Sequence, residues 1–184
     1  MGNLHTISRL PIVFNIKNMA TNLKKISSTE VQNIPNAKDM LFGIVVSEWN
    51  DQITESLCKG AIDCLIENGA KMKNIIVKHV PGSFELNFGA QLLLENTDVD
   101  AVLCLGCVIQ GETRHFEFIC NAVAEGIMKL NTDYNTPVIF GVLTTNTAEQ
   151  AQERSGGKHG NKGTEAAITA IKMVALQQDM ETNY

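Results

Sequence analysis

Four short apolar runs, each followed by a polar turn and a helix-like stretch, constrain most strongly how this chain can fold. The runs are LFGIVVS (residues 41–47), IIVKHV (75–80), AVLCLGCVI (101–109) and PVIFGVLTT (137–145). They are almost continuously apolar, as is typical of parallel strands buried on both faces. Because strands that alternate with helices form βαβ units, we predict an α/β fold of the flavodoxin type. This is a three-layer sandwich in which helices cover both faces of a four-stranded parallel sheet.

Helical patterns follow the strands at residues 51–68, 84–95, 115–130, 147–154 and 164–178. Asn50 or Asp51 can cap the first helix, and Asn146 or Thr147 can cap the fourth. The stretch GGKHGNKG (156–163) is predicted to be a glycine-rich break before the last helix. Residues 41–184 are therefore expected to form one domain, preceded by an extended polar arm over residues 1–40. Met19 is a second candidate start, which would make residues 1–18 an upstream extension or leader.

Charge and hydropathy exclude several classes of protein. The net charge of -5 makes nucleic acid an unsuitable partner. No apolar run is long enough to span a bilayer, and the first residues lack the pattern of a signal peptide. We therefore expect a cytoplasmic protein.

The five cysteines fit a reducing compartment, because their number is odd and their spacing is not that of a disulfide framework. Cys104 and Cys107 form a C-x-x-C, which is a redox or zinc motif in other settings. Here both lie inside an apolar run, and no second C-x-x-C completes a zinc site. We predict buried thiols and no metal.

The densest chemistry lies in residues 105–121, where the third strand ends and a helix begins. In an open parallel sheet, ligands bind outside the carboxyl ends of the strands, and a helix start can hold an anion. Thr113, Arg114 and His115 bring a hydroxyl, a cation and a base that titrates near neutrality to this point. We favour His115 as a functional residue over a surface histidine, whereas Arg114 could equally be a solvated charge.

The residues that follow the first two predicted strands, at the strand exits, each allow two interpretations. Trp49 is either a core residue or a platform on which a flat ligand stacks. Ser83 and Glu85 follow Pro81-Gly82 and either bind hydroxyls or form a capping box for the next helix.

The fourth exit offers Phe140 and a basic cluster of Arg154, Lys158 and Lys162 around the glycine-rich stretch. The cluster either binds phosphate or merely complements a helix terminus. Dinucleotide, P-loop and nucleophile-elbow motifs are absent from the sequence.

Five blocks in this order and spacing resemble the 6,7-dimethyl-8-ribityllumazine synthase family. They are GIVVSEWN, VPGSFEL, LGCVIQGETRHFEFICNAVAEGI, PVIFGVLTT and QAQERSGGKHGNKG. The resemblance covers about residues 41–180. It implies the penultimate step of riboflavin biosynthesis, in which 5-amino-6-(D-ribitylamino)uracil condenses with 3,4-dihydroxy-2-butanone 4-phosphate. The products are the lumazine, phosphate and water, and no cofactor or metal takes part.

The resemblance also implies a role for individual residues. His115 is the implied proton shuttle, and Glu165 is expected to orient Arg154. The implied ligands of the pyrimidine and ribityl chain are Trp49, Asn50, Ser83, Phe84, Glu85, Cys107, Val108, Ile109 and Phe140. The implied phosphate ligands are Glu112, Thr113, Arg154 and Lys162, with Phe140 and Arg154 supplied by a neighbouring subunit.

The same resemblance implies homo-oligomers with active sites between subunits. The uninterrupted G-K-H-G-N-K-G turn favours an icosahedral shell of pentamers over a free pentamer, with the N-terminal arm adding to a neighbour's sheet. Riboflavin synthase is a candidate partner. Asn87 departs from the family pattern, which usually has proline there, and Glu112 replaces a small residue. A catalytically silent shell protein and a lumazine- or flavin-binding module remain alternatives.

Overall fold

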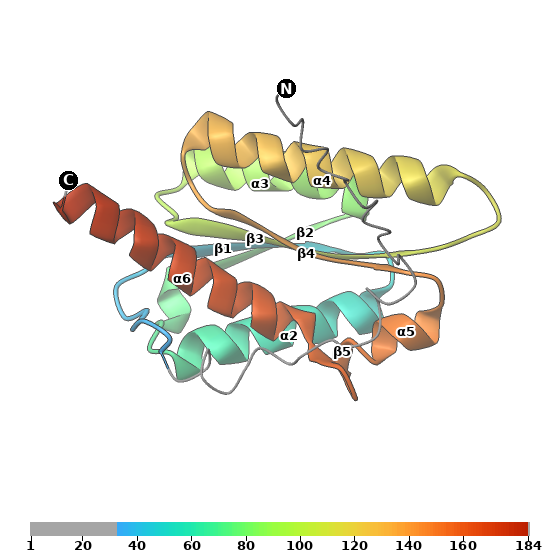
Figure 1. Ribbon diagram of the computed structural model, residues 1–184, viewed down its shortest axis with the longest axis horizontal. Coiled ribbons are helices and arrows are strands. Elements are labelled where there is room, and N and C mark those ends of the chain that lie inside the picture. The colour runs from blue at the N-terminus through green and yellow to red at the C-terminus, as the bar shows by residue number, and fades with distance from the viewer. Residues whose placement is uncertain (1–32, 184) are drawn as a thin grey trace, which may run out of the picture.

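The computed structural model describes residues 33–183 and arranges them in three layers (Figure 1). The middle layer is a parallel sheet in the order β2-β1-β3-β4. Its strands are β1 (Phe42–Ser47), β2 (Ile75–Val80), β3 (Ala101–Ile109) and β4 (Val138–Thr145). β1 pairs with β2 and β3, β3 also pairs with β4, and β2 and β4 form the edges. The predicted four-stranded parallel sheet is confirmed.

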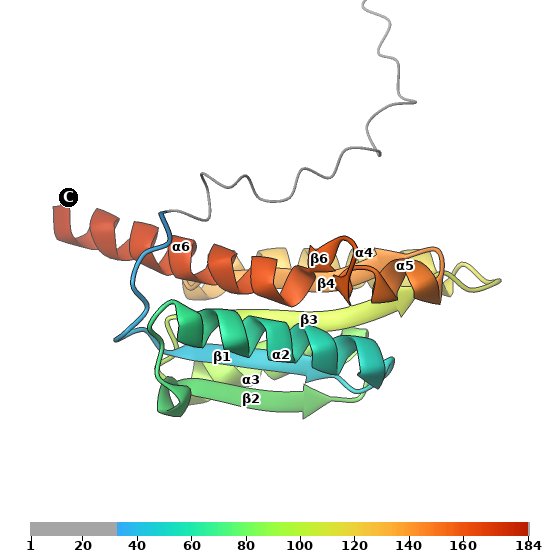
Figure 2. The same ribbon diagram turned by 90° about the horizontal axis from the view of Figure 1, so that it is seen from below.

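Helices cover both faces of the sheet, as Figures 1 and 2 show. One face carries α3 (Leu86–Asn96) and α4 (His115–Tyr134), and the other carries α2 (Asp51–Glu67) and α6 (Lys162–Asn183). The short helix α5 (Ala148–Gln152) follows β4, and the 3-10 turns η2 (Met72–Asn74) and η3 (Ser83–Glu85) precede β2 and α3. α4 runs four residues past the expected end, to Tyr134, and the next residue, Asn135, stops it with a left-handed backbone (φ 49°).

The alternation of side chains along the strands divides the core into two clusters. Ile44 and Val46 of β1 pack with α2 and α6, while Val45 between them packs with α3 and α4. Cys104 and Cys107 follow the same rule and belong to opposite clusters, so their thiols cannot act as a pair. Burial raises the pKa of Cys104 to about 12 and that of Cys107 to about 11, which leaves both protonated at neutral pH.

Two local predictions differ from the structure. The glycine-rich stretch is a small antiparallel hairpin, β5 (Ser155–Gly157) and β6 (Gly160–Asn161), rather than a bare break. Gly156 and Gly160 have φ of 129° and 79°, which explains why glycine is needed there. The helix caps are also resolved. Thr147 caps α5 by accepting a hydrogen bond from Gln150 N, whereas Asn50 occupies the N-cap position of α2 without a side-chain cap bond.

The first 32 residues of the arm predicted over residues 1–40, and with them the second start site, lie outside the described residues. The eight residues before Leu41 are described, and they pack against the domain. Met40 and Ala37 are buried in the core, and Ala37 N donates to Asn68 O at 2.8 Å. Among residues 33–183, no helix combines the length and the apolar character needed to cross a bilayer.

Candidate active site

The site begins where β3 extends beyond the end of its neighbour β1. The β1–β3 ladder ends at the pair Val46 and Leu105, whereas the β3–β4 ladder continues to Ile109 and Thr145. Among residues 33–183, the edge of β3 that faces β1 therefore has no ladder partner from Gly106 to Ile109. Cys107, Val108 and Ile109 line a cavity along this edge, where backbone groups that no strand pairs can bind a ligand.

Around this edge lies a pocket of about 500 Å³, which we call the β3 pocket. Its walls come from the exits of β1, β2 and β3. It contains eight of the predicted pyrimidine and ribityl ligands together with the predicted proton shuttle: Trp49, Asn50, Ser83, Phe84, Glu85, Cys107, Val108, Ile109 and His115. Residues far apart in the sequence thus converge as the strand exits predicted.

The β1 exit is held in place by Asn50. Its Nδ2 donates to Cys107 O at 3.0 Å, and its backbone is left-handed (φ 62°). This bond joins the ends of β1 and β3, and it explains why Asn50 does not cap α2. Beside it, the side chain of Trp49 is 69% exposed, so the core interpretation of this tryptophan is wrong.

The β2 exit forms a tight 3-10 turn that presents its side chains to the pocket. No side chain caps η3 or α3, so the capping-box interpretation of Ser83 and Glu85 is wrong as well. A Cβ on Gly82 would lie 3.0 Å from Glu85 Oε2 and 3.4 Å from the Trp49 ring. A Cβ on Gly106 would lie 2.7 Å from Ser83 Oγ. These two glycines let the turn, the tryptophan and the floor of the pocket come together.

The loop before α4 places its residues unequally. His115 is the first residue of α4 and lines the β3 pocket, with its backbone N 3.4 Å from Thr113 Oγ1. Glu112 and Thr113 are exposed and line neither this pocket nor the one described next. Arg114 is 80% exposed and pairs with Glu117 at 3.3 Å, which favours a solvated charge.

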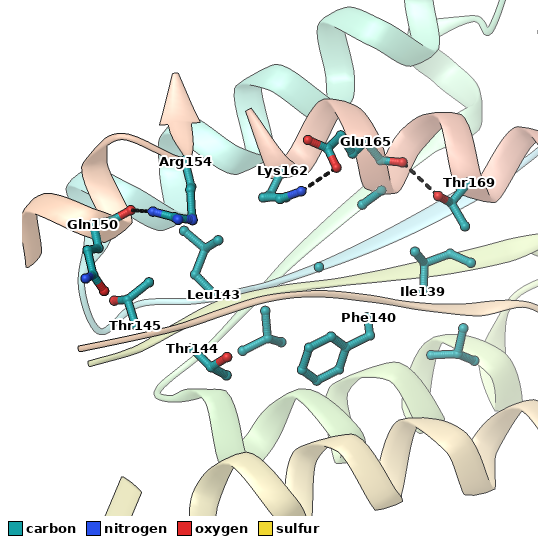
Figure 3. Close-up of a pocket in the computed structure, with 14 residues that line it drawn as sticks. Ile139, Phe140, Leu143, Thr144, Thr145, Gln150, Arg154, Lys162, Glu165 and Thr169 are labelled. Carbon is teal, nitrogen blue, oxygen red and sulfur yellow. Dashed lines mark hydrogen bonds and ion pairs between the residues drawn. The ribbon is translucent and has the colours of Figure 1, made fainter. Parts of the chain in front are cut away.

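A second pocket, of about 660 Å³, follows the free edge of β4, and we call it the β4 pocket (Figure 3). Arg154, Lys162 and Glu165 lie on the side of the strand that α6 covers, whereas Phe140 points from the opposite side (Figure 3). Phe140 is 43% exposed. The β4 pocket thus holds an aromatic ring and two cations but none of the residues that line the β3 pocket.

The hairpin β5–β6 fixes the positions of the two cations, Arg154 and Lys162, which flank it. Lys162 N donates to Arg154 O at 2.9 Å, which places the two residues opposite each other. Arg154 Nη1 donates to Gln150 O at 2.9 Å, and Lys162 Nζ pairs with Glu165 Oε2 at 2.5 Å. Glu165 therefore holds Lys162, and the prediction that it orients Arg154 is wrong. Lys158, the third member of the predicted basic cluster, is 66% exposed and pairs with Glu153 at 2.8 Å. This hydrogen bond lowers the pKa of the Glu153 carboxyl.

Asn161 is a residue that the sequence patterns did not single out. Its Oδ1 accepts from Gly163 N at 2.8 Å and Thr164 N at 3.3 Å, so it caps α6 immediately before Lys162. Its Nδ2 donates to Ser56 O at 2.8 Å and so ties the hairpin to α2. The signal for this cap in the sequence was an asparagine that follows Gly160 and stands directly before a helical pattern. Ile119 in the β3 pocket and Thr169 in the β4 pocket also escaped prediction.

The fold and these pockets define a class of protein: an α/β protein with a candidate small-molecule pocket at the carboxyl ends of its parallel strands and a separate cationic pocket along the sheet edge. The particular family follows from comparison with known proteins. The sequence model of the 6,7-dimethyl-8-ribityllumazine synthase family matches residues 39–178, and the chain belongs to this family.

Curated relatives with that name agree along most of the chain. The protein from Porphyromonas gingivalis is 55% identical over 160 residues, which cover 87% of this chain and 99% of the relative. The protein from Cytophaga hutchinsonii is 63% identical over 142 residues, covering 77% and 89%. The protein from Flavobacterium johnsoniae is 54% identical over 166 residues, covering 90% and 87%. The predicted family is confirmed.

Proposed function

We propose that this chain catalyses the reaction for which its family is named, in the riboflavin pathway. The pyrimidine diamine binds in the β3 pocket, stacked on Trp49, with its ribityl chain along Ser83–Glu85. The butanone phosphate binds nearby, with its phosphate on Arg154 and Lys162. The observation that carries this proposal is the convergence of an exposed tryptophan, open strand backbone and His115 in one pocket.

The chemistry suits these side chains. The amine attacks the ketone, and water leaves to give an imine. Phosphate is then eliminated, and the second amine closes the ring with loss of another water. Each step moves a proton, so a histidine beside the reactants can serve several of them. The departing phosphate requires fixed positive charge, which the two cations of the β4 pocket supply. Most of the remaining acceleration comes from holding two small reactants together.

We further propose that the complete site forms between two copies of the chain. Within one chain, the phosphate cations and Phe140 line a different pocket from Trp49 and His115. Both pockets open at the surface, and a rotation that brings the β4 pocket of one copy to the β3 pocket of the next would unite them. Head-to-tail contacts form a ring when the rotation between copies closes, and we propose that the ring is a pentamer and, from the uninterrupted hairpin turn, that pentamers form an icosahedral shell.

The remaining parts of the proposal concern the surroundings of the enzyme. The N-terminal arm would add to a neighbour's sheet, where the edge strands β2 and β4 offer places for it. Riboflavin synthase, which would consume the product, is the candidate partner. We propose the reducing cytoplasm as the location of the protein, because its cysteines are odd in number and none of the described ones forms a disulfide.

The direct test mixes the protein with both substrates and follows lumazine absorbance and phosphate release. A protein-free control is required, because the reactants also condense slowly unaided. The proposal is supported if lumazine and phosphate both form faster than in the control and in equal molar amounts. If folded, assembled protein gives no acceleration but binds the lumazine, the chain is a binding module. If it neither accelerates nor binds, it is a silent shell protein.

His115→Ala should lower turnover by only about tenfold, because proximity and phosphate binding remain when the proton shuttle is lost. Steady-state kinetics with both substrates measure this effect. His79→Ala is the matched control, since His79 lies on β2 and pairs with Glu55 at 2.8 Å, outside both pockets. A loss of several thousandfold in His115→Ala would contradict the shared-shuttle mechanism and make this histidine the principal catalyst.

A further inference from the structure

Two of the walls of the β3 pocket belong to different helical elements. One wall is η3, which supplies Ser83, Phe84 and Glu85, and the other is the start of α4, which supplies His115 and Ile119. The width of the pocket therefore depends on how η3 and its continuation α3 are fixed against α4. Any group that joins these helices near the pocket controls the distance between the ribityl ligands and the proton shuttle.

One side chain makes such a connection. Asn87 lies two residues after Glu85, in the first turn of α3, and its Nδ2 donates to Ala122 O of α4 at 3.2 Å. Among residues 33–183, the other side-chain hydrogen bond between these two helices is far away, where Tyr134 Oη donates to Glu95 Oε1 at 2.6 Å. Asn87 is thus the cross-helix hydrogen bond nearest the pocket.

The point that Asn87 contacts lies on the same face of α4 as the pocket wall. His115, Ile119, Ala122 and Gly126 follow one another at intervals of four, three and four residues, which places them in one stripe along a helix. Because a helix is stiff over two turns, a shift of its contact with Asn87 moves His115 and Ile119 as well.

The fit at this contact is close. A Cβ on Gly126 would lie 2.2 Å from Asn87 Nδ2, so the helix carries a glycine where the amide packs. The Oδ1 atom of Asn87 is buried and has no hydrogen-bond partner among the described residues. An unpaired buried oxygen opposes folding, and an apolar side chain of the same size would avoid that cost. The asparagine is therefore poorly explained by stability alone.

We propose that Asn87 is a positioning residue, which sets the spacing between the ribityl-binding turn and the helix that carries His115. The proposal rests on the proposed function for the identity of the ligand. This role would explain why the chain has Asn87 where the family usually has proline, because the asparagine amide joins the two walls of the pocket. The proposed phosphate ligands Arg154 and Lys162 lie in the β4 pocket, so a substitution of Asn87 should not affect phosphate binding.

The test compares Asn87→Leu, which keeps the size but removes the donor, with wild type. We expect the KM for the pyrimidine diamine to rise about fivefold, as for loss of one neutral hydrogen bond. The KM for butanone phosphate should stay unchanged, and the thermal midpoint should hold or rise, because leucine removes the buried unpaired oxygen. Asn96→Leu is the matched control, because Asn96 also lies on α3 but its amide donates to Leu92 O of the same helix, at 2.8 Å. If Asn87→Leu does not fold, Asn87→Ala replaces it, because alanine cannot overpack.

The outcomes separate positioning from a merely structural role. If the thermal midpoint and kcat fall while both KM values stay constant, Asn87 is structural and the proposal is overturned. Wild-type kinetics in Asn87→Leu overturn it too. If wild type itself shows no turnover, the proposed function has failed, and hydrogen exchange at residues 83–86 decides instead. Faster exchange in Asn87→Leu than in Asn96→Leu then supports the positioning role, and equal exchange overturns it.

Discussion

Arg154→Ala should lower kcat/KM by about 100- to 1,000-fold, the effect expected when one charged group that stabilises a departing anion is lost. The guanidinium is held by its bond to Gln150 O and lies opposite Lys162, so the variant keeps one cation in the β4 pocket but loses a donor that can bind phosphate through two hydrogen bonds. Steady-state kinetics with both substrates measure the loss, which should include a higher KM for butanone phosphate. Arg154→Lys should recover part of it, because the charge returns without the planar fork.

Lys158→Ala is the matched control for this experiment. It removes a cation from the same hairpin, but Lys158 is paired with Glu153 and lines neither pocket. Its kinetics should stay within about twofold of wild type, since exposed ion pairs contribute little. An equal loss in both variants would mean that the net charge of the hairpin, rather than a specific contact of Arg154, attracts the substrate. Near-normal turnover in Arg154→Ala would place the phosphate elsewhere.

The same variant tests whether the site lies between subunits. Subunits of Arg154→Ala keep an intact β3 pocket, and subunits of a Trp49→Ala/His115→Ala variant keep an intact β4 pocket. In assemblies formed from an equal mixture, about one quarter of the interfaces would combine two intact halves if copies associate head to tail. Co-assembled protein should then be clearly more active than either parent. A site contained in one chain would give no such recovery.

The sequence predicted most of the fold because its information is local. β2 and β3 have the predicted limits, since continuous apolar runs bounded by turns are a strong signal for buried parallel strands. The strand exits also predicted the β3 pocket, because parallel strands end at the same edge. The hairpin β5–β6 was missed, since two- and three-residue strands carry no periodicity and glycine-rich stretches have no apolar pattern.

What the sequence could not predict depends on packing between distant residues. Asparagine is a common helix-capping residue, but the side-chain amide of Asn50 instead donates to Cys107 O at the end of β3. Glu165 lies one helical turn from Lys162 and pairs with it, although a pattern of charges could not distinguish that partner from Arg154. The resemblance implied that Phe140 and Arg154 come from a neighbouring subunit, but the position of β4 at the edge of the sheet, which separates the two pockets, cannot be read from the order of the strands in the chain.

Gly163→Ala should lower the free energy of unfolding by roughly 3 kcal/mol, which corresponds to a fall of about 6–12 °C in the thermal midpoint. Helix propensity alone predicts the opposite sign, because Gly163 lies in the first turn of α6 and alanine favours helix by about 1 kcal/mol. Packing decides the outcome. A Cβ at this position would lie 1.8 Å from Leu57 O, and the backbone of α2 cannot move aside as a flexible side chain could. Scanning calorimetry of the assembled protein measures the midpoint.

Gly111→Ala supplies the matched control, because a Cβ there meets nothing within 4 Å and the midpoint should hold or rise slightly. The loss in Gly163→Ala should extend beyond stability. α6 can relieve the overlap only by withdrawing from α2, and this breaks the bonds by which Asn161 ties the hairpin to Ser56 O and caps α6. Lys162 and Arg154 would then move together, so turnover by the fraction that remains folded should fall as well. A variant that unfolds earlier yet turns over normally while folded would show that the close contact of α2 with α6 serves stability alone.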